Sequence, residues 1–101
     1  MNTELSKIIQ LINQKNFQKA ETLSRKELAK EPNSFTLNKA LAISLLAQKK
    51  YNQSLISFNK CYELNQNDYD INVNIALIFN KVQDYQNAIF FSPDSYFRNR
   101  I

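Results

Sequence analysis

The residues that could carry chemistry in this chain are a single cysteine, Cys61, and a few acidic and basic clusters. The 101 residues contain no histidine and no glycine. Without imidazole, the commonest acid–base group at neutral pH and most zinc sites are missing, and without glycine there is no glycine-rich phosphate loop. The acidic pairs Glu27 with Glu31 and Asp68 with Asp70 lack a partner set for catalysis. We therefore expect a protein that is not an enzyme and that uses no metal or other cofactor.

Cys61 and the lysines fit structural roles better than chemical ones. A single cysteine cannot form an intramolecular disulfide, and no neighbour in the sequence indicates a lowered thiol pKa, so we interpret Cys61 as a packing residue. Lys19, Lys26 and Lys30 form one stripe of a predicted helix and could be read as a phosphate-binding edge. Glutamates lie beside them and no aromatic platform accompanies them. The stripe is therefore interpreted as a solvated helix face, and nucleic acid is not the expected partner.

Helical periodicity runs through the whole length. Apolar residues recur at three- and four-residue spacing, which predicts helices over about residues 5–12, 17–31, 34–46, 51–64 and 68–81. Asn16, Ser34 and Asp68 stand at N-cap positions. A sixth helix is expected to open with Asp84 and to end before Pro93. The predicted fold is all-α, with antiparallel helix pairs.

A shift of the chain by about 34 residues, the length of a two-helix repeat, brings similar residues into register. The aligned sets are Phe17 with Tyr51 and Tyr85, Ala20 with Ser54 and Ala88, Leu11 with Leu45 and Phe79, and Ile8 with Ala42 and Ala76. A fixed period of this length indicates stacked two-helix units, each burying its apolar face against the next. The function is then expected to lie in a surface.

The period, the two-helix unit and the residue pattern resemble tetratricopeptide (TPR) repeats. The second repeat carries the pattern with Leu41, Ala42, Leu45, Tyr51, Ser54 and Phe58. The resemblance covers about residues 2–92. It implies an α-solenoid of about six helices in one domain, 1–92, with repeats 1–34, 35–68 and 69–92, the third incomplete, and a tail at 93–101.

Several positions depart from the family pattern. Asn38 and Asn72 stand where the family often has tryptophan. The family's usual glycine turn position holds Lys15, Lys49 and Gln83. One residue in each turn is therefore expected to adopt a backbone conformation that is less favourable for a residue other than glycine.

TPR proteins bind extended or helical peptides in a concave groove lined by the first helix of each repeat. The resemblance assigns these residues to the groove: Leu5, Ile9, Ile12, Lys39, Ile43, Leu46, Val73, Leu77, Asn80 and Lys81. Its centre is apolar, as at an interaction site; the alternative is that some of these residues pack inside the solenoid. The positions of the family's C-terminal carboxylate clamp hold Leu5, Ile9, Ala40, Asp70 and Asn74, so the clamp is absent and an acidic chaperone tail is not expected.

The leading functional hypothesis is a scaffold that binds an apolar or amphipathic segment of a protein or peptide partner in this groove. The alternative is homo-oligomerisation through the same apolar surface or through the C-terminal end, where no polar helix completes the stack. No apolar run approaches the roughly 20 residues of a membrane span, and no signal peptide is recognisable. We therefore expect a cytoplasmic protein without a membrane partner.

Overall fold

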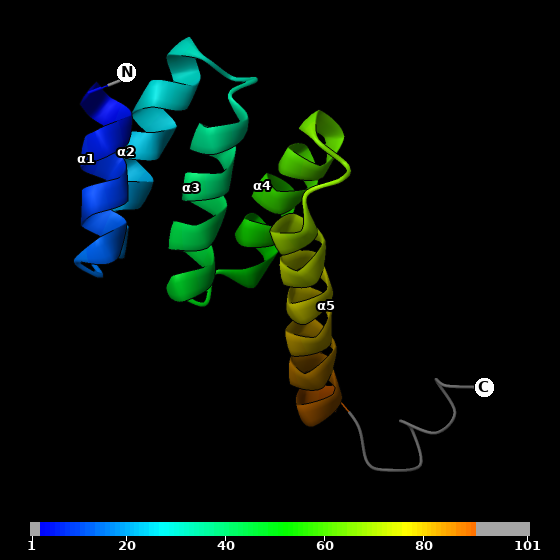
Figure 1. Ribbon diagram of the computed structural model, residues 1–101. Coiled ribbons are helices and arrows are strands. Elements are labelled where there is room, and N and C mark those ends of the chain that lie inside the picture. Colours follow the sequence, from blue (N-terminus) through cyan, green and yellow to red (C-terminus); the bar gives the residue numbers. More distant parts are fainter. Residues whose placement is uncertain (1–2, 91–101) are drawn as a thin grey trace.

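The computed structural model describes the backbone of residues 3–90 and the side chains of residues 3–83. Within residues 3–90 it contains helices and no strand (Figure 1), which confirms the all-α prediction. The helices are α1 (Thr3–Asn13), α2 (Phe17–Lys30), α3 (Phe35–Ala47), α4 (Tyr51–Leu64) and α5 (Tyr69–Phe90). Residues 93–101, predicted to be a tail, lie outside the described residues. No helix in the described part of the chain has both the length and the apolarity to cross a membrane.

Two of the three predicted N-caps are confirmed. The backbone N–H of Leu37 donates to Ser34 Oγ at 3.2 Å, and the N–H of Ile71 donates to Asp68 Oδ1 at 3.0 Å. Each bond satisfies one of the amide groups that the first turn of a helix leaves without a partner. Asn16 occupies the N-cap position of α2, but its side chain makes no capping hydrogen bond there. The expectation for its side chain was therefore wrong.

The first two hairpin turns share one backbone geometry. Lys15 and Lys49, one repeat apart, have φ of 61° and 62°, in the left-handed region that favours glycine. Their amides donate to Ile12 O and Leu46 O, each at 2.9 Å. This confirms the expectation that one residue in each of these two turns adopts an unfavourable backbone conformation.

The asparagines at equivalent positions of the second and third repeats also share their contacts. The Asn38 side-chain amide donates to Pro32 O at 3.1 Å, and that of Asn72 donates to Gln66 O at 3.3 Å. Both tie the start of a helix to the loop that precedes it. The fold is thus repeat-like in its hydrogen bonds as well as in its residues.

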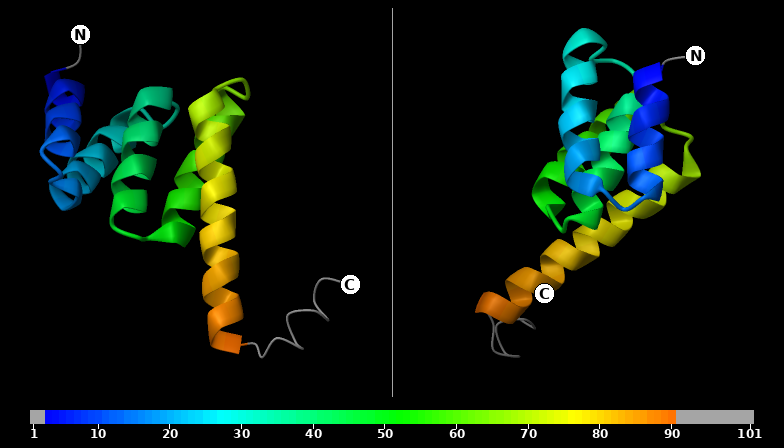
Figure 2. Two further views of the ribbon diagram at one scale, coloured as in Figure 1. Left: turned by 60° about the horizontal axis from the view of Figure 1, so that its bottom comes forward. Right: turned by 90° about the vertical axis from the view of Figure 1, so that its left-hand side faces the viewer.

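The expected third turn and the helix opening at Asp84 are wrong, because α5 continues without a break from Tyr69 to Phe90. The first two turns contain the polar residues Gln14 and Gln48, whereas the equivalent position 34 residues after Gln48 holds the apolar Val82. Val82 packs against the buried cluster of α3, α4 and α5, as Ile71, Ile75 and Ile78 do one and more turns earlier. The buried stripe therefore crosses the expected turn and favours continued helix. Both views in Figure 2 show α5 running beyond the other helices.

Helices adjacent in the chain are adjacent in space, and α1 also contacts α3. One buried cluster joins Ile8 of α1 to Leu37 and Ala40 of α3. A second joins Ala42 of α3 to α4 and α5 through the buried residues Phe58, Cys61, Ile71 and Ile78. Helix α3 is therefore central to both clusters and fixes the positions of α1 and α5 on either side of it (Figure 1).

Candidate functional site

A pocket of about 220 Å³ lies between α1 and α3. Its lining comes from one face of each helix: Ile9 and Ile12 from α1, and Thr36, Lys39, Ala40 and Ile43 from α3. The α3 residues follow an i, i+3, i+4, i+7 pattern, which places them on one side of that helix. The pocket brings together four of the predicted groove residues.

The other predicted groove residues divide between packing and exposure. Leu5 and Leu46 are partly buried and pack against the two core clusters, as do the pocket residues Ile12 and Ile43. The exposed residues of the set are Ile9, Val73, Leu77, Asn80 and Lys81. Those on α5 do not line the pocket.

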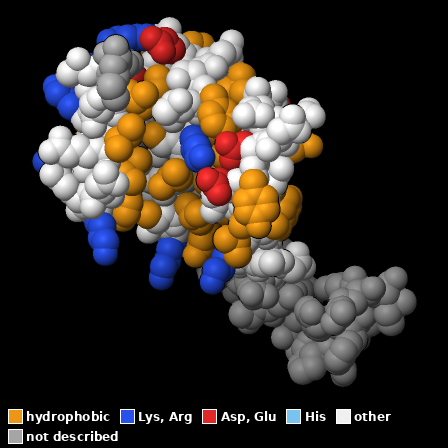
Figure 3. All heavy atoms as spheres, in the orientation of Figure 1, with side chains coloured by type: hydrophobic (Ala, Val, Ile, Leu, Met, Phe, Trp, Pro, Cys, Tyr) orange, Lys and Arg blue, Asp and Glu red, His pale blue; other side chains and the backbone are white. Residues whose placement is uncertain are grey.

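Apolar side chains continue from the pocket across this face. Figure 3 shows hydrophobic side chains gathered over α1, α3 and α5, with a few charged side chains among them. Ile9 is 42% exposed and Leu77 is 50% exposed, so apolar surface remains in water on both sides of α3. Exposed apolar area that no packing requires is typical of interaction sites.

Lys39 is a charged centre on this face. Its Nζ lies 3.7 Å from Asp70 Oδ2 and 3.9 Å from Asp68 Oδ2, and 6.0 Å from the centre of the Phe35 ring. The Lys39 side chain is only 26% exposed, whereas that of Asp70 is 73% exposed. The two carboxylates offset the lysine charge and present a negative rim to an incoming partner. Sequence reasoning missed this cluster, because Lys39 and the two aspartates lie far apart in the sequence and no local signal relates them.

The positions that a carboxylate clamp would use have other roles. Ala40 is buried in the core, and the Asn74 side-chain amide donates to Asp70 O in its own helix at 2.9 Å. Together with the exposed Asp70, these positions supply no cation for a carboxylate.

Cys61 lies in the core and is fully buried. Burial raises the pKa of its thiol to about 11, so the thiol stays protonated at neutral pH. Its Sγ donates to Phe35 O at 4.0 Å. These contacts favour the packing role expected for it.

The lysine stripe of α2 is exposed at Lys19, Lys26 and Lys30. Lys30 pairs with Glu27 at 3.5 Å. Within the described side chains, no group of three or more His, Cys, Asp or Glu residues lies close enough to share a metal ion.

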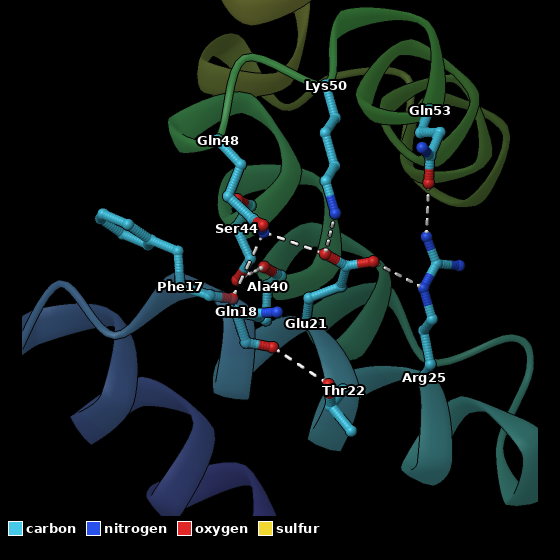
Figure 4. A network of polar contacts seen from close by, with 10 residues as sticks. All are labelled: Phe17, Gln18, Glu21, Thr22, Arg25, Ala40, Ser44, Gln48, Lys50 and Gln53. Carbon is cyan, nitrogen blue, oxygen red and sulfur yellow. Dashed lines mark hydrogen bonds and ion pairs between the residues drawn. The ribbon is translucent and has the colours of Figure 1, made fainter.

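A polar network around Glu21 holds α2 against the turn between α3 and α4 (Figure 4). Lys50 Nζ and Gln48 Nε2 donate to Glu21 Oε1 at 3.0 and 2.9 Å, and Arg25 Nε donates to Oε2 at 3.1 Å. Arg25 also reaches Gln53 of α4 at 2.9 Å. Burial acts to raise the pKa of Glu21, but these hydrogen bonds outweigh it and lower the pKa below 4.5. The network is a structural tie that the sequence pattern did not reveal.

Comparison of the chain with protein-family models, with curated proteins and with solved structures gives no match. The geometry therefore carries the functional argument. It defines an all-helical, repeat-like protein whose α1, α3 and α5 share an apolar face.

Proposed function

We propose that this chain is a TPR-like, non-enzymatic binding module that holds an apolar or amphipathic segment of a protein partner across α1, α3 and α5. The observation that carries the proposal is the α1–α3 pocket, lined by Ile9, Ile12 and Ile43 and continued by exposed Val73 and Leu77 on α5. An amphipathic helix presents apolar anchors at three- and four-residue spacing to such a surface.

The size of the pocket limits the ligand. At about 220 Å³ it is smaller than the roughly 300–1,000 Å³ of small-molecule sites, so it suits one apolar anchor side chain of a longer segment. The rest of the segment would lie over the exposed Leu77, with the exposed Asn80 and Lys81 beside it in the sequence.

Charge sets a preference for the orientation of the segment. Asp70 is exposed beside Lys39 near the N-terminal end of α5, and Lys81 lies about three turns further along this helix. A segment with a basic residue near Asp70 and an acidic residue near Lys81 would complement both.

Site-specific photo-crosslinking tests the proposal. A photoreactive phenylalanine at Ile9 should crosslink a protein from native lysate, and mass spectrometry should place the linkage in an apolar or amphipathic segment. Adding Ile43→Asp and Leu77→Asp should remove the crosslink while the helical circular dichroism signal is retained.

The matched control places the same photoreactive residue at Lys26, on the exposed stripe of α2. An Ile9 crosslink that survives both aspartates would refute the groove. A linkage pattern shared by the Ile9 and Lys26 positions would show non-specific contact and would also refute it.

A further inference from the structure

Helix α5 contributes a strip of mixed charge and apolarity to the proposed groove. This α5 strip consists of exposed residues at three- and four-residue spacing: Asp70, Val73, Leu77 and Lys81. At its N-terminal end Lys39 of α3 pairs with both Asp68 and Asp70, so these three side chains carry one net negative charge. Read from the C-terminal end of α5, the strip is therefore basic at Lys81, then apolar, then acidic.

Residues 91–101, which lie outside the described residues, contain the complementary features in the order that a returning segment needs. Asp94 comes first, Tyr96 and Phe97 follow, and Arg98 and Arg100 come last. A segment that returns along α5 from the end of this helix runs antiparallel to it. Its acidic residue then meets the basic end of the α5 strip, its aromatic residues meet the apolar middle, and its arginines meet the acidic end.

The spacing of the charges agrees with this pairing. Lys81 and Asp70 are eleven residues apart, which is about 17 Å along a helix. In an extended segment, Asp94 lies about 13 Å from Arg98 and about 20 Å from Arg100. The two arginines therefore bracket the position of Asp70.

The segment is also long enough to reach the acidic end of the strip. Phe90, the last residue of α5, lies about 30 Å from Asp70 along the helix axis. The ten residues 91–100 span about 33 Å when extended, and the arginine side chain extends this reach further. Pro93 disfavours a helical conformation in the residue before it, which favours an extended backbone over a continued helix.

Charge directs this segment to the α5 strip rather than to other surfaces of the chain. Residues 1–60 contain ten lysines or arginines and four glutamates, whereas residues 61–90 contain four acidic residues and one lysine. Residues 91–101 contain two arginines and one aspartate, so the first part repels them and the second attracts them. The opposite face of α5, at Tyr69, Ala76 and Phe79, has no charge that could select them.

We propose that residues 94–100 bind the α5 strip of their own chain. The inference rests on the proposed function, because it names an occupant for the α5 part of that groove. A weak contact is sufficient, since a short tether holds the segment at an effective concentration in the millimolar range. A protein partner has to displace the segment from Val73 and Leu77, whereas the α1–α3 pocket has no α5 residue in its lining and stays available.

Photo-crosslinking of the purified full chain tests the inference without any partner. A photoreactive phenylalanine in place of Phe97, at low micromolar protein concentration, should form a link within a single chain. Trypsin digestion should then yield peptide 61–81 joined to peptide 82–98. Fragmentation of the joined peptides should place the link at Val73 or Leu77.

Three substitutions separate the α5 strip from the rest of the helix. Leu77→Asp and, independently, Asp70→Lys should each lower the yield of the link about fivefold. The matched control is Phe79→Asp on the opposite face, because Phe79 and Leu77 are 57% and 50% exposed; it should leave the yield unchanged. Adding Arg98→Asp and Arg100→Asp to Asp70→Lys exchanges the charges and should restore the link. Circular dichroism confirms that each variant is folded.

Five results would overturn the inference. They are no link within the chain, a link to the opposite face of α5, links between two chains instead of within one, equal yields in Leu77→Asp and Phe79→Asp, and a charge exchange that restores nothing. The proposed function fails separately, because its test is the capture of a lysate protein at Ile9. A link from position 97 without that capture supports this inference and rejects the partner, and capture without the link does the reverse.

Discussion

Replacing Glu21 by glutamine should lower the free energy of unfolding by about 2 kcal/mol at pH 7, because it removes a charged hydrogen-bond acceptor. The Glu21 side chain is 13% exposed and accepts hydrogen bonds from Lys50, Gln48 and Arg25. A hydrogen bond to a charged group contributes about 1.5–3 kcal/mol. Lys50 and Arg25 are 39% and 48% exposed, so solvent screening reduces each of their contributions to about 1 kcal/mol or less.

The pH dependence follows from the lowered pKa of Glu21. The folded protein holds this pKa below the ordinary 4.5, so the charged form is favoured by folding. This stabilisation is fully present above pH 4.5 and is lost as the pH falls through the folded pKa. Glu21→Gln lacks the titrating group, so the stabilities of the two proteins should converge below that value.

Urea unfolding followed by circular dichroism, at pH 7 and at steps down to about pH 3, measures both effects. A loss of about 2 kcal/mol corresponds to a decrease of about 10 °C in the thermal midpoint of a domain of this size. Glu63→Gln is the control, because Glu63 is 71% exposed and lies 4.0 Å from Lys60. It should change stability by less than about 0.5 kcal/mol. Equal stability losses in the two variants, or a Glu21→Gln deficit that persists unchanged at pH 3, would contradict the role assigned to the Glu21 carboxylate.

Two further predictions concern buried hydroxyls and turns. Ser24 Oγ is fully buried and is without a hydrogen-bond partner among the described residues, so Ser24→Ala should leave the urea midpoint unchanged or raise it. Ser54→Ala removes the hydrogen bond to Ala42 O and should lower the free energy of unfolding by about 1 kcal/mol. Equal stability losses in the two variants would contradict this. Lys49→Gly should raise the free energy of unfolding by about 0.5–1 kcal/mol, because φ at this position is 62°, where glycine is favoured. Lys49→Ala should not raise it, because alanine keeps the Cβ atom. Urea titrations measure both, and a rise in both variants would mean that the lysine charge, not the backbone angle, is responsible.

The local features of the fold were predictable from the sequence. The caps at Ser34 and Asp68 and the turns at Lys15 and Lys49 depend on residues within about four positions of one another. Such features can be predicted without knowing how the rest of the chain folds. The prediction of a side-chain cap at Asn16 was wrong, because an asparagine can make a capping hydrogen bond only where the local geometry allows it.

The candidate site was only partly predictable. The register placed Ile9, Ile12, Lys39 and Ile43 on one face, and the structure brings these four to a common pocket. The two acidic partners of Lys39 are Asp68 at the end of its own repeat and Asp70 in the next one, so no local pattern relates them to it. The same holds for Glu21 and Lys50, which are separated by the whole of α3.

The spacing of apolar residues is enough to predict that the chain is helical, that it repeats with a fixed period, and which residues share a register position. How the third unit departs from the first two depends on packing between the helices. There Val82 packs on the cluster formed with α4, which favours helix over a turn, and the continued helix leaves Phe79 in water where Leu45 is buried. The reason is physical: helix formation follows local spacing, whereas burial depends on which neighbour is present to supply the other side of the contact.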